Sequence, residues 1–106
     1  MNKELVNKAI TSNNIEWRKH SLERMLQRGI SCQNVKDVLL KGEIIEHYKN
    51  DKPFESALFY KKIDKPLHVV ASLDKNEIKI YVITAYIPDN SHFLEDLKTR
   101  KSNEKQ

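Results

Sequence analysis

The chain has few cysteines, glycines and prolines and no long apolar run, which argues against disulfide-rich, low-complexity and membrane-spanning proteins. It holds one cysteine among 106 residues, so no internal disulfide can form and a reducing compartment such as the cytoplasm fits it best. Its longest apolar run, residues 80–87, is interrupted by Thr84 and is far shorter than the roughly 20 apolar residues that cross a membrane. Only 2 glycines and 3 prolines are present, against 32% charged residues. We therefore expect a compact cytoplasmic domain with short loops, with no membrane partner.

The short motifs of metal and nucleotide chemistry are also missing. The sequence has no CxxC pair, no HxxxH pair and no carboxylate cluster that would suggest a zinc site. It has no glycine-rich phosphate-binding loop either. We expect no metal and no cofactor, so any chemistry must come from ordinary side chains.

The net charge of +4 is unevenly distributed. Residues 98–106 (KTRKSNEKQ) carry +3, which leaves +1 for the rest of the chain. We expect residues 1–97 to form a single domain and residues 98–106 to be a basic, disordered tail. Because the body is nearly neutral, its overall charge argues only weakly for a nucleic-acid partner, and the placement of charges has to carry that argument.

Helical periodicity dominates the first part of the chain. It predicts three helices, over residues 2–11, 20–28 and 32–41. Ser31 is a good N-cap, and Gly29 and Gly42 are each expected to end a helix in the left-handed conformation. Cys32 falls on the apolar stripe of the last helix, which predicts a buried thiol. Residues 15–19 are ambiguous between helix and strand.

Beyond Gly42 the periodicity is that of strands. Four are expected, over residues 43–49, 56–63, 67–73 and 78–87. Strands joined by short loops pair antiparallel. Ser91 could begin a last short helix that includes Phe93, Leu94 and Leu97. The predicted fold is therefore α+β, with N-terminal helices packed on a four-stranded antiparallel sheet and a short C-terminal helix.

One helix carries a stripe of cations. His20, Arg24 and Arg28 are spaced by four residues, so each is turned only about 40° from the last, roughly opposite the apolar positions. A guanidinium group can donate two hydrogen bonds at once to the oxygens of a phosphate. A histidine can accept or release a proton near neutral pH. The stripe suits a phosphate, although it is also what the solvated face of an amphipathic helix looks like.

The turn between the last two strands decides whether His68 shares a face with Thr84 and Tyr86. A two-residue loop would separate them, whereas a three-residue loop over residues 74–76 would unite them. The absence of Asn-Gly or Asp-Gly favours the three-residue loop, with Asn76 left-handed. We therefore expect the three side chains on one surface. They could equally be ordinary sheet residues, with Tyr86 in the core or at its rim.

Four segments, WRKHSLERMLQRGIS, VLLKGEIIEHY, PLHVV and VITAYIPD, together resemble a small bacterial family described as a domain of unknown function, DUF4258. The family is similar in layout to RelE-like and barnase-like ribonuclease toxins. The resemblance implies a RelE-like layout and a metal-independent, toxin-type endoribonuclease of the mRNA interferase kind. It implies RNA as substrate, including ribosome-associated mRNA, and a cognate antitoxin protein as partner. The corner at 91–93, often occupied by Trp in the family, departs from the pattern.

The resemblance also implies roles for the candidate residues. The catalytic positions would be His20, His68 and Tyr86, and the substrate-binding positions Arg24, Arg28 and Thr84. Metal-free RNA cleavage needs a base for the 2′-hydroxyl, an acid for the 5′-oxygen and cations for the charged phosphorane. The two histidines would supply the acid and the base in either order.

Two other hypotheses stay open. The chain could be a non-catalytic RNA- or protein-binding module of the same fold, or an interaction domain whose sheet edge pairs with a partner strand. A groove that joins both histidines would favour cleavage, and histidines on opposite sides of the sheet would favour binding alone.

Overall fold

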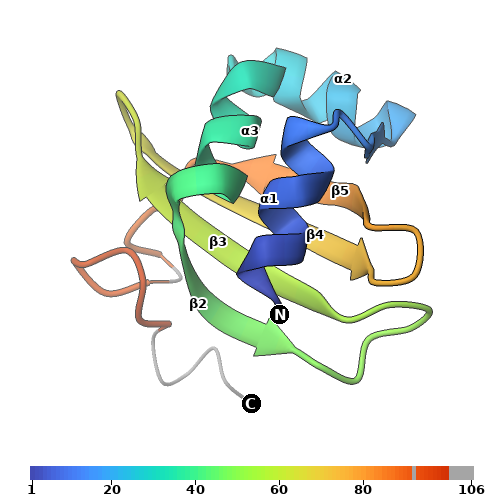
Figure 1. Cartoon of the computed structure of the whole chain (residues 1–106). Helices are drawn as coiled ribbons and strands as arrows, with labels where there is room; N and C mark the ends of the chain where they lie inside the picture. Colours follow the sequence, from blue (N-terminus) through green and yellow to red (C-terminus); the bar gives the residue numbers. More distant parts are fainter. Residues whose placement is uncertain (92, 101–106) are drawn as a thin grey trace.

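Helices come first along the chain and a sheet follows. The structure, a computed structural model, describes residues 1–91 and 93–100. Its elements in chain order are α1 (Lys3–Thr11), β1 (Ile15–Trp17), α2 (Lys19–Arg28), α3 (Cys32–Lys41), β2 (Glu43–Tyr48), β3 (Ser56–Lys62), β4 (Pro66–Asp74) and β5 (Lys79–Tyr86). The α+β class is confirmed, together with the N-terminal helices and the four main strands (Figure 1). Within this part of the chain no helix is both long and apolar enough to cross a membrane.

Local signals set most of the helix ends. The side chain of Asn2 accepts hydrogen bonds from two backbone amides in the first turn of α1, and Ser31 Oγ accepts one from the Asn34 amide at the start of α3. These caps satisfy amides that have no partner within the helix. Gly29 ends α2 with φ 69°, the left-handed region that glycine adopts without strain.

Gly42 ends α3 for a different reason from the one expected. Its φ of −77° is not left-handed, so the predicted left-handed stop is wrong. A Cβ atom here would lie 2.4 Å from the Val38 carbonyl oxygen and 2.7 Å from the Tyr60 carbonyl oxygen. The glycine is needed because the end of α3 and strand β3 approach each other backbone to backbone.

The prediction that Cys32 is buried is also wrong, because the thiol is exposed. The buried stripe of α3 begins one turn later, at Val35, and continues through Val38 and Leu39. Cys32 is the first residue of the helix, and the core ends before reaching it.

The sheet has five strands in the order β1-β5-β4-β3-β2, not the four antiparallel strands expected. The extra strand, β1, comes from the ambiguous residues and pairs parallel to β5, with Ile15 opposite Ile80. Asn14 holds the two together, since its side-chain amide donates to the Ile78 carbonyl at 2.9 Å and its own carbonyl accepts from the Ile80 amide at 3.1 Å. A strand of three residues is too short for its periodicity to be recognised in the sequence.

The three helices gather along one face of the sheet (Figure 1). The core between them includes Leu67 and Val69 of β4. Because side chains alternate along a strand, His68 between these two points to the other face. We call this the distal face, and its side chains on the three central strands include Ser56, Tyr60, His68, Val70, Ser72, Tyr81, Thr84 and Tyr86.

The expected loop between β4 and β5 is wrong. Asp74 pairs with Lys79, so the loop spans residues 75–78 and not 74–76. The residue with positive φ is Ile78, at 51°, whereas Asn76 is not among the positive-φ residues. The Asp74 carboxylate organises the loop by accepting hydrogen bonds from the next backbone amides, which a search for hairpin dipeptides does not reveal.

A bulge nevertheless gives the expected grouping on the distal face. The register of β4 against β5 shifts between Val70 and Ala71, where β5 contains one extra residue. Beyond this point His68 lies opposite Tyr86, and Val70 lies opposite Thr84. Because a bulge reverses the alternation of one strand, His68, Thr84 and Tyr86 share a face, as predicted, although for a different reason.

The expected C-terminal helix is also wrong. Residues 93–100, which we call the strap (red in Figure 1), form a tight hairpin in which Phe93 and Arg100 make an isolated antiparallel bridge. The Asp96 carboxylate accepts hydrogen bonds from the amides of Lys98 and Thr99 and so favours a turn over a helix.

Part of the predicted tail belongs to this strap. Lys98 Nζ lies 3.0 Å from a carboxylate oxygen of Glu43, and Arg100 pairs with Glu46, so both residues contact the sheet. Residues 101–106 of that tail, and His92 in the predicted helix, lie outside the described residues.

The two glycines provide a test of this packing. Replacing Gly42 with Ala should lower the free energy of unfolding by about 2 to 3 kcal/mol, since the new methyl group would overlap two carbonyl oxygens. Gly29→Ala is the matched control; it meets open space and should cost about 1 kcal/mol, for the left-handed backbone alone. Urea unfolding of the two variants measures the difference, and a larger loss for Gly29→Ala would contradict this account.

Candidate functional site

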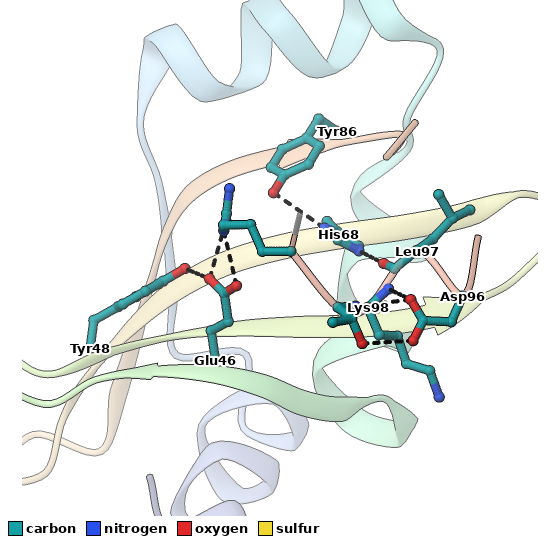
Figure 2. Close-up of polar contacts among 9 residues, drawn as sticks. Glu46, Tyr48, His68, Tyr86, Asp96, Leu97 and Lys98 are labelled. Carbon is teal, nitrogen blue, oxygen red and sulfur yellow. Dashed lines mark hydrogen bonds and ion pairs between the residues drawn. The ribbon is translucent and has the colours of Figure 1, made fainter. Parts of the chain in front are cut away.

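His68 is the buried centre of the distal face, with 0% of its surface exposed. Its Nε2 lies 2.7 Å from the Leu97 carbonyl oxygen, and its Nδ1 lies 3.2 Å from the Tyr86 hydroxyl (Figure 2). A carbonyl oxygen can only accept, so Nε2 carries a hydrogen. In the neutral ring Nδ1 then accepts from the Tyr86 hydroxyl, and both ring nitrogens are satisfied.

The surroundings favour this neutral form. Burial lowers the pKa of His68 below its ordinary value of 6.5, and the charge of Arg100 acts in the same direction, against the hydrogen bond to Leu97 and the charge of Glu46. Burial also raises the pKa of Tyr86, so its hydroxyl keeps its proton at neutral pH. The pair is a neutral acceptor beside a neutral donor.

Aromatic rings enclose the imidazole. The rings of Tyr60, Tyr86 and Phe93 lie 5.6, 5.2 and 4.7 Å from the ring centre of His68, all in edge-on arrangements. Such packing excludes water from the ring nitrogens. Tyr86 is only half-buried, so it is the member of the pair that a ligand could touch.

A charged group lies beside this pair. Arg100 donates to both carboxylate oxygens of Glu46, at 3.1 Å each, and the Tyr48 hydroxyl donates to the same carboxylate (Figure 2). Burial acts to raise the pKa of Glu46, but the hydrogen bonds from Arg100 and Tyr48 outweigh it and hold that pKa below its usual range. The side chains of Arg100 and Glu46 are 27% and 23% exposed, so both can be reached from solvent.

These contacts form one site. The guanidinium of Arg100 lies 4.7 Å from the ring centre of Phe93, and its charge opposes the rise in the pKa of Tyr86. We call the set the distal cluster; it consists of Glu46, Tyr48, His68, Tyr86 and Arg100. It offers a proton acceptor, a hydroxyl donor, a carboxylate and a guanidinium within one surface.

Three members of the distal cluster were not predicted from the sequence. Glu46 and Tyr48 share a face two residues apart on a half-buried strand, which is a weak signal that could have drawn attention to them. Arg100 gave no signal, because it stands among the tail's basic residues. Only the strap brings it to the sheet.

Helix α2 runs along β5 where β1 ends. Ser21 Oγ donates to the Ile83 carbonyl at 2.6 Å, and Arg28 Nη1 donates to the Ala85 carbonyl at 2.7 Å. Arg28 is therefore anchored to the backbone directly beside Tyr86. The helix satisfies carbonyl groups that a longer edge strand would have bound.

The other stripe residues, His20 and Arg24, are exposed on α2. Within the described residues no hydrogen bond joins His20 to the distal cluster, and the two candidate histidines do not form a pair. The structure thus brings together His68, Thr84 and Tyr86 on the sheet. Arg28 of α2 lies beside them through its hydrogen bond to the Ala85 carbonyl of β5, whereas His20 and Arg24 of the same helix are exposed.

Another hollow, of about 730 Å³, lies elsewhere, at the end of the sheet that carries the chain's first residue. Two of its cations already share one carboxylate: the N-terminal amine lies 3.8 Å from Glu55, and Lys75 lies 3.3 Å from the same carboxylate. The distal cluster is the better candidate because its groups combine partial exposure with shifted pKa values.

Comparison with known proteins gives a family but no function. A family model described as a domain of unknown function (DUF4258) matches residues 17–87. This range includes Glu46, His68 and Tyr86 but ends before the strap and Arg100. No curated protein matches the chain. The chemistry of the site has to be argued from its geometry.

The buried imidazole predicts a pH dependence of stability. Because the folded chain binds the proton of His68 less readily than the unfolded chain, the free energy of unfolding should fall as the pH drops below 6.5, towards the lowered pKa. His68→Gln should flatten this dependence between about pH 7.5 and 5. His20→Gln, which removes an exposed imidazole, is the control and should retain it. Urea titrations across this range measure the slopes; equal slopes in wild type and His68→Gln would contradict the account.

Proposed function

This chain belongs to the DUF4258 family, and from the geometry of the distal cluster we propose that it is a metal-independent endoribonuclease. The observation that carries the proposal is the hydrogen bond between a half-exposed Tyr86 hydroxyl and the buried Nδ1 of His68. A hydroxyl held against a neutral imidazole can accept a proton from a substrate while passing its own to the ring.

The reaction would proceed by internal transfer at the RNA phosphate. The 2′-hydroxyl gives its proton to the Tyr86 oxygen, whose own proton moves to His68 Nδ1. The 2′-oxygen bonds to phosphorus and the bond from phosphorus to the 5′-oxygen breaks, which leaves a 2′,3′-cyclic phosphate and a 5′-hydroxyl. His68, now charged, is stabilised by its bond to Leu97 and by the charge of Glu46.

Arginines would hold the phosphate. Arg100 uses two of its donors on Glu46 and keeps others for a phosphate oxygen. Arg28 is bonded to the strand that carries Tyr86, and Arg24 lies one turn before it on the same stripe of α2. Thr84, opposite Val70 on the distal face, could orient a further phosphate oxygen. These cations would stabilise the phosphorane as its charge develops.

His20 would supply the second proton. The 5′-oxygen leaves as an alkoxide unless an acid protonates it, and His20 is the exposed histidine on the helix that Ser21 and Arg28 fasten to β5. Solvent then restores the proton to His20 and removes one from His68. In this proposal His68 acts through Tyr86 and does not touch the RNA.

A second candidate is RNA binding without cleavage. It is favoured by the placement of the histidines, because His20 is on α2, which packs with the other helices on one face of the sheet, whereas His68 points to the distal face. It is also favoured by the completeness of the pairing in the cluster: both nitrogens of His68 are bonded, and the Glu46 carboxylate is held by Arg100. In this second candidate the cluster has a structural role and holds the strap against the sheet, without taking part in catalysis. The cleavage experiment below separates the two candidates.

We also propose a toxin-type role, with a cognate antitoxin protein as the partner that blocks the site. A protein that blocked this site would have to cover Tyr86 and Arg100 on the distal face. It would therefore contact the strap as well as the sheet.

Removal of the Tyr86 hydroxyl tests the cleavage proposal. Purified wild-type protein should cleave single-stranded RNA with EDTA present, and Tyr86→Phe should lower the rate by about 100- to 10,000-fold with little change in affinity. Tyr60→Phe is the matched control, because it removes a hydroxyl from a ring that also packs on His68, and it should retain the rate. His20→Ala should lower the rate comparably.

Gel analysis with end-labelled RNA measures these rates and identifies the cyclic phosphate. Cleavage that disappears with EDTA would contradict the metal-independent mechanism. Binding without cleavage by the wild-type chain would favour the second candidate.

A further inference from the structure

A groove of about 370 Å³ crosses the distal face beside the distal cluster. Ser56, Val70, Ser72 and Tyr81 line it from the sheet, and Phe54 lines it from the loop between β2 and β3. Arg18, which connects β1 to α2, lines it from the other side. The groove is a concave site of a size that small ligands fill.

Two parallel rings form one side of the groove. Phe54 and Tyr81 are stacked with their ring centres 5.5 Å apart and an angle of 13° between their planes. Both rings are partly exposed, although Tyr81 lies on a central strand. Lys79 Nζ lies 5.4 Å from the ring centre of Tyr81. Stacked aromatic side chains with cations nearby are the elements on which unpaired nucleobases bind.

A pair of hydroxyl groups adds a polar feature. Ser56 Oγ and Ser72 Oγ lie 2.7 Å apart, and both residues are more than nine-tenths buried. Only one hydrogen can lie between the two oxygens, so the second hydroxyl keeps a hydrogen to donate. This donor can meet an acceptor on the edge of a base.

The charges at the groove favour a polyanion. Arg18 and Lys52 line it against the single carboxylate of Asp51. A purely apolar occupant would leave these cations and the serine pair without a role. A base with its phosphate would use the rings, the hydroxyl groups and the cations together.

The groove and the distal cluster lie along the same strands. His68 belongs to the cluster, Ser72 to the groove, and Val70 between them lies opposite Thr84. The four-residue step from His68 to Ser72 spans about 13 Å along β4. One strand of RNA can therefore occupy both.

From these observations we propose that the groove binds an unpaired nucleobase of the RNA strand whose phosphate reaches the distal cluster. The inference rests on the proposed function for its substrate, and it adds the requirement that the RNA be single-stranded. Bases in a duplex are stacked and paired and are not available to the rings.

Binding is tested separately from cleavage, in a Tyr86→Phe background with EDTA present. Fluorescence anisotropy with a labelled single-stranded RNA should show that Tyr81→Val weakens binding by about 5- to 100-fold, the range for loss of one stacked base. Ser72→Val is a second variant that fills the groove and should also weaken binding. The affinity for duplex RNA should not change with either.

A pair of lysine variants tests the charges. Lys52→Ala should weaken single-stranded RNA binding and lower the slope of its salt dependence by about one. Lys41→Ala removes the same charge from an exposed position at the end of α3 and should leave both unchanged.

The outcomes separate this proposal from the proposed function. If Tyr81→Val and Ser72→Val bind single-stranded RNA as tightly as the parent chain does, the groove does not bind a base, even if the wild type cleaves RNA. Weakened binding by these variants in a chain that never cleaves would support the groove and refute the nuclease. A wild-type chain that neither binds nor cleaves single-stranded RNA would overturn both.

Discussion

A fully buried imidazole bonded at both nitrogens organises the distal half of this molecule. His68 donates to Leu97 of the strap and accepts from Tyr86 of β5. A buried polar group left without its partners would cost on the order of 1–3 kcal/mol. The hydrogen bonds of the His68 ring therefore hold the strap against the sheet. The ring can do this in one neutral tautomer only, because the Leu97 carbonyl must receive a hydrogen.

The charged part of the site depends on that attachment. With the strap fastened by His68 and Phe93, Arg100 reaches the Glu46 carboxylate and lies beside Tyr86. Arg100, which follows the last strand by 14 residues, thus completes the distal cluster, whose other members are on the sheet. This explains how a family match that ends at residue 87 can include most of the site and still leave out its guanidinium.

Periodicity in the sequence predicted the three N-terminal helices and the four main strands. The face shared by His68 and Tyr86 was predicted from the expected turn between β4 and β5; the grouping is confirmed, but that turn is wrong and a bulge produces the grouping. Periodicity could not predict the rest, because the causes are not periodic. The bulge beside Val70 depends on pairing between strands, and β1 is held to β5 by contacts of Asn14. The role of Arg100 follows from the way the strap folds onto the sheet, and nothing in its surrounding residues distinguishes it from a solvated cation.

The most direct test of the central claim is nitrogen NMR of the His68 ring, with and without a single-stranded RNA whose 2′-hydroxyls are methylated to prevent cleavage. At neutral pH the free protein should show a neutral ring protonated at Nε2. Saturating RNA should shift the Nδ1 signal, because the Tyr86 hydroxyl then also contacts the ligand. A ring that is charged or protonated at Nδ1 in the free protein, or an Nδ1 signal that RNA does not move, would contradict the account.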